Sequence, residues 1–316
     1  MMKIAAVTGA TGFVGKHLVR ALVAHGYHVK ALTRRPQGNT KRIEWIEGDL
    51  KDISSLTHLV EKADVVFHLA GLIKAKNKTD FYDINSQSVK TLISIIQKSK
   101  AKPHFILLSS LAARERHLST YADSKRCGEE TLEGILVDQK NMEIPWTILR
   151  PPGVYGPEDM ETLKIFKSIS AHIAPLPASA NNRASWIYAP DLAEAMIATV
   201  DNHNCLGKIL DVDDGKDGGY SNQEMYETAA NILNKRPFQF IVPKFMLKII
   251  AHFNALFSTL FVYTPMLTPE KINELCHPDW ICGDPHVMRV TDWKPETGLK
   301  QGFEKTLKWY KENDLM

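Results

Sequence analysis

The sequence predicts an α/β protein in which a doubly wound parallel sheet is joined to a smaller, mostly helical lobe. Short apolar runs alternate with amphipathic segments through the first half of the chain, and a glycine-rich turn follows the first run. A Pro-Pro-Gly break at residues 151–153 ends the alternation. Such alternation implies parallel strands joined by right-handed crossovers, with helices on both faces of the sheet. The first half therefore has the pattern of a Rossmann fold.

The elements of the first half follow from the spacing of its apolar residues. Buried strands are expected at the short apolar runs, residues 4–7, 29–32, 43–46, 65–69, 105–108 and 147–149. Helices are expected where apolar residues recur every three or four positions, at residues 14–24, 53–61, 84–98 and 121–137.

The second half has a different pattern. Prolines recur after the break, and helices are expected at residues 192–200, 222–233, 245–260 and 303–311, with one strand at 208–212 that returns to the sheet. We therefore divide the chain into a Rossmann domain, residues 1–150 with a return segment at about 186–214, and a lobe made of residues 151–185 and 215–316.

The composition excludes some classes of partner. The chain has 316 residues, of which 44% are hydrophobic and 24% charged, as in a globular protein. Its net charge of +3 is too mild to indicate a nucleic-acid partner without a basic cluster beside aromatic residues. We expect a monomer or a homodimer that acts on a small molecule.

The cysteines indicate a reducing compartment. Cys127, Cys205, Cys276 and Cys282 are irregularly spaced, and no signal peptide precedes the first strand. We therefore expect free thiols in a cytoplasmic protein. Cys276, His277 and Cys282 could be imagined as part of a metal site, but the further Cys-x-x-Cys pair that would complete a tetrahedral set is missing, so no metal is expected.

The turn after the first strand can hold a pyrophosphate. Its glycines have G-x-x-G-x-x-G spacing between a strand and a helix. Without a Cβ, such a turn brings backbone N–H groups against a phosphate at the positive end of the helix. The expected contacts are Gly9, Thr11, Gly12, Phe13, Val14 and Gly15. The alternative is a glycine-rich turn that binds no ligand.

The end of the second strand favours NADP over NAD. A dinucleotide fold usually has an acid there to hold the ribose 2′-hydroxyl, but no Asp or Glu occurs before Glu44. Arg34 and Arg35 stand there instead, and guanidinium groups suit the oxygens of a 2′-phosphate. The alternative is that both arginines are solvated surface charges and that NAD binds through Thr33.

The segment after the third strand offers a contact for the adenine end. Asp49, followed by Leu50, can accept a hydrogen bond from the adenine amine. Asp49 can equally be a helix cap.

The catalytic candidates are Ser110, Tyr121 and Lys125. Tyr121 and Lys125 are four residues apart and share one face of a helix. A nearby ammonium favours the phenolate, so the pKa of Tyr121 is expected to lie below its usual value. A tyrosine tuned in this way exchanges a proton with a substrate oxygen during hydride transfer, while Lys125 also bonds the nicotinamide ribose. The alternative is a tyrosine and a lysine on a helix surface.

These residues, in this order, resemble the short-chain dehydrogenase/reductase superfamily, above all its extended and atypical members of the NAD(P)-dependent epimerase/dehydratase type. The similarity runs through residues 8–15, 48–50, 68–71, 109–110, 121–125, 150–157, 183–191 and 293–310. It implies a cofactor cleft lined by Leu69, Ala70, Gly71 and Ser109, nicotinamide contacts from Pro151, Gly153 and Val154, and a substrate site with Arg183 and Trp186. It also favours Ser110 over Ser109 as the serine that faces the substrate. Arg183 would reach an anion such as a sugar phosphate, and the alternative is a pairing with a local carboxylate.

The chain departs from the family pattern after the serine pair. Leu111 and Ala112 supply neither the usual sugar contacts nor the acid that dehydratases carry, so elimination of water is not expected.

The helix expected at 245–260 has an apolar stripe. Such a stripe is more often part of a core than anything else, and His252 on it is expected to be packed or solvated. The alternatives are a mouth for an apolar substrate and contact with a membrane surface.

We expect an enzyme, and the sequence leaves more than one class of reaction open. One hypothesis is an NAD(P)-dependent oxidoreductase or epimerase of a secondary alcohol or ketone, for example in a nucleoside-diphosphate sugar. A second is a reductase of a bulky apolar ketone, which could be steroid-, flavonoid- or lipid-like. A third, a non-catalytic NADPH-binding sensor or accessory subunit, is disfavoured because all three catalytic candidates are present.

Overall fold

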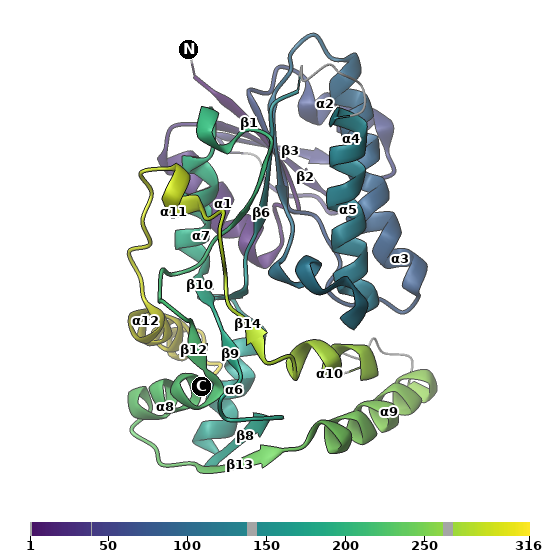
Figure 1. The fold of residues 1–316 in the computed structure, drawn as a ribbon. Coiled ribbons are helices and arrows are strands. Elements are labelled where there is room, and N and C mark those ends of the chain that lie inside the picture. The colour runs from purple at the N-terminus through teal and green to yellow at the C-terminus, as the bar shows by residue number, and fades with distance from the viewer. Residues whose placement is uncertain (1, 39, 138–143, 262–267) are drawn as a thin grey trace.

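A fully parallel sheet of seven strands forms the centre of the protein. The computed structural model describes residues 2–38, 40–137, 144–261 and 268–316, and the side chains of 137 and 255–261 lie outside this description (Figure 1). The strand order is β11-β6-β5-β4-β1-β2-β3. The strands are β1 (Ile4–Thr8), β2 (His28–Thr33), β3 (Ile43–Glu47), β4 (Val65–His68), β5 (His104–Leu108), β6 (Trp146–Arg150) and β11 (Lys208–Asp211). The predicted doubly wound fold is confirmed, and each of these strands lies within one residue of its expected bounds.

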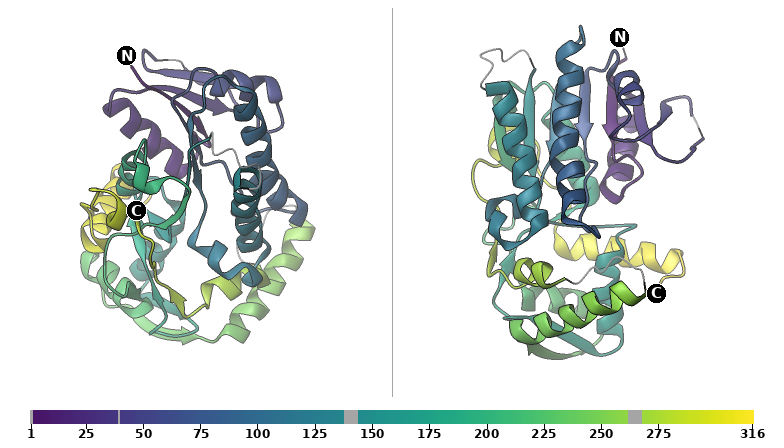
Figure 2. Two further views of the ribbon diagram at one scale, coloured as in Figure 1. Left: turned by 45° about the horizontal axis from the view of Figure 1, so that its top comes forward. Right: turned by 90° about the vertical axis from the view of Figure 1, so that its right-hand side faces the viewer.

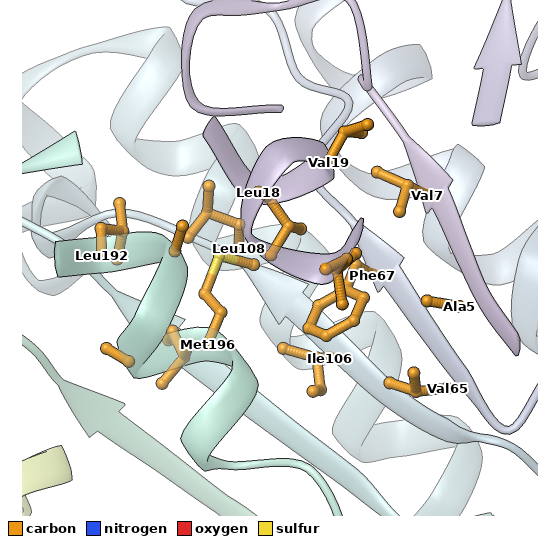
Figure 3. Close-up of a cluster of buried hydrophobic side chains, with 14 of the residues drawn as sticks. Ala5, Val7, Leu18, Val19, Val65, Phe67, Ile106, Leu108, Leu192 and Met196 are labelled. Carbon is orange, nitrogen blue, oxygen red and sulfur yellow. The ribbon is translucent and has the colours of Figure 1, made fainter. Parts of the chain in front are cut away.

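Helices cover both faces of this sheet. One face carries α1 (Phe13–Ala24) and α7 (Ala189–Ala198), and the other carries α2 (Ile53–Val60), α4 (Ser88–Lys98) and α5 (Thr120–Val137). Alternate residues of each strand point to opposite faces. Val7 and Phe67 therefore pack against Leu18 of α1 and Met196 of α7, as Figure 3 shows. Ala6 belongs to the cluster beneath the other three helices.

The helix expected at 84–98 has a different form. It starts earlier, as α3 (Lys78–Tyr82), and passes through a π-helical turn, η1 (Asp83–Gln87), before α4. Apolar periodicity predicts where a helix lies, but it does not reveal the single extra residue that makes one turn π-helical. A π-turn places an extra residue in the helix and often marks a functional site.

The second half forms a lobe that contains more short strands than expected. Its helices are α6 (Met160–Ser170), α8 (Asn222–Ile232), α9 (Lys244–Phe261), α10 (Pro269–Leu275), α11 (Val287–Val290) and α12 (Leu299–Glu312). Its strands are β7 (Gly153–Tyr155), β8 (Ile173–Pro177), β9 (Arg183–Ala184), β10 (Trp186–Tyr188), β12 (Tyr220–Ser221), β13 (Phe238–Val242) and β14 (Asp279–Trp280). Strands of two to five residues are too short to show a period of two in the sequence.

An aromatic cluster fills the lobe. The ring of Tyr155 lies 5.1 Å from that of Phe303 and 5.8 Å from that of Tyr188, centroid to centroid. Phe166 of α6 continues the cluster toward Tyr310 of α12. Because β7 begins directly after the Pro-Pro pair that follows β6, this cluster fixes the lobe to the end of the sheet.

The core interpretation of the 245–260 stripe is wrong for its described part. Leu247 and Ala251 of α9 face α10, where Ala251 is buried with Ile272. The remaining apolar residues, Phe245, Met246, Ile249, Ile250 and Phe253, are exposed to solvent. The stripe is not buried because α10 covers only one side of α9. Figure 2 shows α9 at the lower right edge of the molecule in its left view and in front of the rest of the lobe in its right view.

The four cysteines are free thiols. Within the described residues, no helix has the length and apolar character needed to cross a bilayer.

Two buried histidines link the strands through polar contacts. Nδ1 of His68 lies 2.6 Å from the hydroxyl of Thr8, and its Nε2 lies 2.9 Å from that of Ser88. Nε2 of His104 lies 2.9 Å from the hydroxyl of Thr147. Burial lowers the pKa of His68 to about 3 and that of His104 to about 4. Both imidazoles are therefore neutral in the folded protein at neutral pH.

We predict that the free energy of unfolding falls as the pH drops from about 6.5 toward 4. A histidine in the unfolded chain gains its proton near pH 6.5, whereas these two do so only at lower pH, so acid favours unfolding. Urea titrations at a series of pH values would measure this. His104→Gln should reduce the pH dependence, and the exposed control His252→Gln should leave it unchanged. If acid lowered the free energy of unfolding of the His104 variant as much as that of the wild type, His104 would not be a source of the pH dependence.

Candidate active site

The turn between β1 and α1 has no room for side chains. Gly9 has φ +72°, and a Cβ on it would lie 2.7 Å from the backbone nitrogen of Ala70. A Cβ on Gly15 would lie 2.0 Å from the carbonyl oxygen of Gly9. Gly12 begins α1 without a side-chain cap, so its first N–H groups are left for another acceptor. This cradle fits a pyrophosphate.

A cleft of about 680 Å³ opens beside this turn, at the carboxyl ends of the strands. Many of the predicted cofactor contacts line it: Gly9, Thr11, Gly12, Arg34, Asp49, Leu50, Leu69, Ala70 and Gly71. A second cleft, of about 930 Å³, shares Thr11 and Arg34 with the first and adds Arg35 and Lys16. The volumes of both clefts lie in the range that is typical of ligand sites. A dinucleotide therefore fits the residues present.

The two arginines at the end of β2 are free to meet an anion. Both are exposed, and neither forms an ion pair with a carboxylate of the described residues. In contrast to these two arginines, Lys16 and Arg20 on α1 each form an ion pair with Glu158 of the lobe at 2.5 Å.

The helix-cap interpretation of Asp49 is wrong. The cap of α2 is Asp52, whose carboxylate accepts a hydrogen bond from the N–H of Ser54 at 3.0 Å. Asp49 accepts one from the N–H of Lys51 at 2.7 Å and lines the cleft. Asp52 follows Asp49 by three residues, and the path of the chain places Asp52 at the start of α2.

Tyr121 lies in the first turn of α5 and is surrounded by groups from distant elements. The side chain of Ser110 lies beside its phenol, and the ring of Phe81 lies 6.4 Å from its ring, centroid to centroid. The ammonium of Lys271 in α10 lies 5.5 Å from the same ring. Burial raises the pKa of Tyr121, and the contributions of Ser110 and Lys271 only partly offset this. The expected lowering of the pKa is therefore wrong for this state, and Tyr121 is a protonated phenol at neutral pH.

Lys125 lies one helical turn further, at the wall of the cleft. It is buried, and its ammonium donates to the carbonyl oxygen of Leu108 at 3.0 Å. A Cβ on Gly71 would lie 3.0 Å from this ammonium, so Lys125 meets the cleft at Gly71. Burial lowers the pKa of Lys125 to about 8.

The two serines after β5 have different partners. The hydroxyl of Ser109 is buried and donates to Glu129 of α5 at 2.5 Å. The hydroxyl of Ser110 accepts from the N–H of Ala112 at 3.2 Å and contacts the Tyr121 phenol. Ser110 is thus the serine beside the phenol.

Two buried residues that the sequence interpretation missed support these groups. Glu129 holds Ser109 and also accepts two hydrogen bonds from Arg150, at 2.8 and 2.5 Å. Asn85, in the π-turn, donates to the hydroxyl of Ser124 at 2.8 Å and accepts from the N–H of Leu72 at 2.9 Å. The one signal for Asn85 was an asparagine inside an expected helix, where this residue type is unfavourable.

The short helix α10 closes the site from the lobe side. Glu270 accepts a hydrogen bond from the N–H of Thr120 at 2.9 Å, and Glu274 accepts one from the hydroxyl of Ser119. Both contacts are at the start of α5, next to Tyr121. The sequence interpretation did not include α10, since its contacts span about 150 residues of sequence.

The remaining predicted residues lie where β6 leads into the lobe. Pro151 accepts a hydrogen bond from the N–H of Leu111 at 2.9 Å, and Val154 pairs with Ile187 between β7 and β10. The ring of Trp186 lies over Gly153, where a Cβ would be 2.8 Å away. Arg183 donates to the carbonyl oxygens of Gly218 and Gly219 and lies 3.7 Å from Glu224.

Comparison with known proteins identifies relatives over the whole chain. The profile of the NAD dependent epimerase/dehydratase family matches residues 5–211. A ceramide reductase of Caulobacter vibrioides is 33% identical over 98% of this chain and 94% of its own length. A UDP-glucose 4-epimerase of Vibrio cholerae is 25% identical over 97% of this chain and 95% of its own length.

Solved structures show the same fold. A UDP-glucose 4-epimerase of Thermotoga maritima with UDP-glucose matches with a TM-score of 0.76 at 17% identity, over 99% of both chains. MoeE5 in complex with UDP-glucuronic acid and NAD matches with a TM-score of 0.75 at 19% identity, over 98% of this chain and 99% of that one.

We predict opposite effects for two Gly→Ala substitutions in helices. Gly15→Ala should abolish dinucleotide binding and lower the free energy of unfolding, because its Cβ would overlap the backbone of Gly9. The control Gly134→Ala, in α5 with open space around it, should raise that free energy by about 0.5–1 kcal/mol. Thermal unfolding and titration with the dinucleotide would measure both. Normal binding by the Gly15 variant would contradict the cradle.

Proposed function

The chain belongs to the NAD-dependent epimerase/dehydratase family and is an enzyme of it, and from this premise we propose that it reduces a ketone in a ceramide-like lipid with NADPH. The observation that carries the proposal is the protonated Tyr121 phenol beside Ser110, at the edge of a cleft that fits a dinucleotide. A protonated phenol is a proton donor, as carbonyl reduction requires.

The proposed step uses three side chains of this chain. When bound, the dinucleotide supplies the hydride that adds to the carbonyl carbon and is itself oxidised. Ser110 holds the carbonyl oxygen by a hydrogen bond, and Tyr121 gives its proton to that oxygen as the C=O double bond becomes a C–OH single bond. The phenolate that remains takes a replacement proton from solvent, and Lys125, which meets the cleft at Gly71, would hold the nicotinamide ribose.

A lipid substrate is favoured over a nucleotide sugar by three observations. The relative with 33% identity over nearly the whole chain is a ceramide reductase. Two N–H groups of Arg183 already donate to backbone carbonyls, which leaves less of its guanidinium for a diphosphate. Leu111, Ala112 and Ala113, where sugar contacts would be expected, are buried.

An epimerase of a nucleotide sugar is the second candidate, because a UDP-glucose 4-epimerase matches nearly the whole chain. Hydride transfer is common to both reactions, but an epimerase keeps its dinucleotide through the cycle. Interconversion of UDP-glucose and UDP-galactose by the purified protein without added cofactor would favour this candidate over the reductase.

We predict that Tyr121→Phe abolishes turnover while NADPH still binds. The substrate is a detergent-dispersed ceramide-type lipid whose secondary alcohol is oxidised to a ketone, and the readouts are NADPH absorbance and the alcohol product. Loss of the proton donor should lower kcat by about 10²–10⁴-fold. The control is Tyr226→Phe, which alters a buried tyrosine of α8 and should keep normal activity. Comparable activity in the Tyr121 variant would remove it from the mechanism, and a wild-type protein inactive on this ketone would overturn the substrate class.

We predict that replacing Arg34 and Arg35 by Ser weakens NADPH binding about tenfold or more and changes NADH binding little. Each arginine can form charge-assisted hydrogen bonds with a 2′-phosphate, which NADH lacks. Dissociation constants for both cofactors would measure this, with the exposed neighbour Lys41→Ser as the control. Equal losses for NADPH and NADH would show that the arginines do not recognise the phosphate.

A further inference from the structure

We propose that the exposed apolar face formed by β13 and α9 docks on an anionic lipid bilayer. This docking face consists of eight large apolar side chains: Ile173, Phe238, Phe240, Phe245, Met246, Ile249, Ile250 and Phe253. Three phenylalanines are the most exposed of them, with Phe238 at 73%, Phe245 at 65% and Phe253 at 59% of their full surface. Single exposed apolar residues are normal, but a contiguous group of this size marks an interaction site.

The docking face is continuous because its elements adjoin. β13 pairs with β8, the strand of Ile173, and α9 begins two residues after β13 ends. The exposed apolar residues of α9 recur at intervals of three and four, so they form one stripe along the helix. The opposite side of α9 packs on α10 through Ala251. Figure 1 shows β13 and α9 along one edge of the molecule, away from the parallel sheet.

The charge around the docking face selects an anionic surface as its occupant. Residues 228–269 contain four basic residues, Lys235, Arg236, Lys244 and Lys248, and no Asp or Glu. An apolar stripe flanked by basic side chains is the pattern of a helix that lies in a membrane interface. Each basic residue near an anionic bilayer adds attraction that salt weakens. A second copy of this chain is a poorer partner, because a symmetric interface would bring like charges together.

The docking face is connected to the active site through α10. Ala251 of α9 contacts Ile272 of α10, and Lys271 on the same helix lies above the Tyr121 ring. A protein docked through α9 would therefore hold α10, and the site that α10 closes, near the bilayer. Membrane binding is inferred from the surface alone, and only its purpose, access to a lipid, rests on the proposed function.

The test is co-sedimentation of the full chain with vesicles, without substrate or cofactor. We expect binding to vesicles of equal parts phosphatidylcholine and phosphatidylglycerol, much weaker binding to phosphatidylcholine alone, and loss of binding at high salt. The variant Phe245→Ser/Ile249→Ser/Phe253→Ser and the variant Lys244→Glu/Lys248→Glu should each lower the partition coefficient about tenfold or more. Urea unfolding would verify that both variants fold.

Matched controls lie on the other half of the molecule. Ile53→Ser removes an equally exposed apolar residue from α2, and Lys90→Glu reverses an exposed charge on α4, so neither should alter vesicle binding. The proposal would be overturned if the wild-type protein failed to co-sediment with anionic vesicles, or if the triple Ser variant bound them as well as the wild type does. A wild-type dimer that the triple Ser variant converts to a monomer in light scattering would also overturn it, since a second copy would then cover the face.

Activity separates this proposal from the proposed function. With the ketone lipid in vesicles, both variants should turn over at least tenfold more slowly than wild type, and with the same lipid in detergent they should match it. Vesicle binding without reduction of the ketone would leave the docking face standing and refute the substrate class. Equal rates of wild type and variants on vesicles would refute the docking face while leaving the reductase in place.

Discussion

One face of α5 holds the candidate site together. Tyr121, Lys125 and Glu129 recur at intervals of four, so their side chains leave the helix on the same side. This face can reach the cleft only if α5 packs closely against the preceding helix. A Cβ on Gly128 would lie 2.2 Å from the carbonyl oxygen of Asn85, which shows how close that approach is. The π-turn around Asn85 supplies the matching surface, and its amide reaches Ser124 on the same helix.

The buried polar groups around this face are fully paired, which makes the site rigid. Within the described residues, no buried side-chain nitrogen or oxygen lacks a partner. Glu129 is fully buried and pairs with the mostly buried Arg150, and removing Arg150 from such a pair costs roughly 3–5 kcal/mol because the buried carboxylate is left alone. Arg150 ends β6, directly before the lobe begins. The pair therefore connects the catalytic helix to the point from which the lobe is positioned.

The neighbouring helices α9 and α10 of the lobe make different kinds of contact. Glu270 and Glu274 of α10 accept hydrogen bonds from residues at the start of α5, and α10 thereby closes the space above Tyr121. In its described part, α9 buries one narrow side against α10 and leaves its broad apolar side in contact with solvent. A helix packed in this way adds little to the core, and its exposed stripe is better explained by a partner outside the chain.

The sequence by itself determined the features that depend on short-range pattern. The alternation of strands and helices, the glycine spacing at the first turn and the four-residue interval between Tyr121 and Lys125 are local properties, and each strand of the main sheet follows from them. The NADP preference, the roles of the site residues and the domain division are still predictions.

Only the tertiary structure decided the features that depend on residues far apart in the chain. The pKa of Tyr121 is raised because burial outweighs the opposing contributions of Ser110 and Lys271, and Lys271 lies 150 residues away in the sequence. Glu129 holds Ser109 while Ser110 lies beside the phenol, and the described part of α9 is exposed because α10 covers only one of its sides. Burial and the approach of distant charges are properties of the folded chain, so no local pattern encodes them.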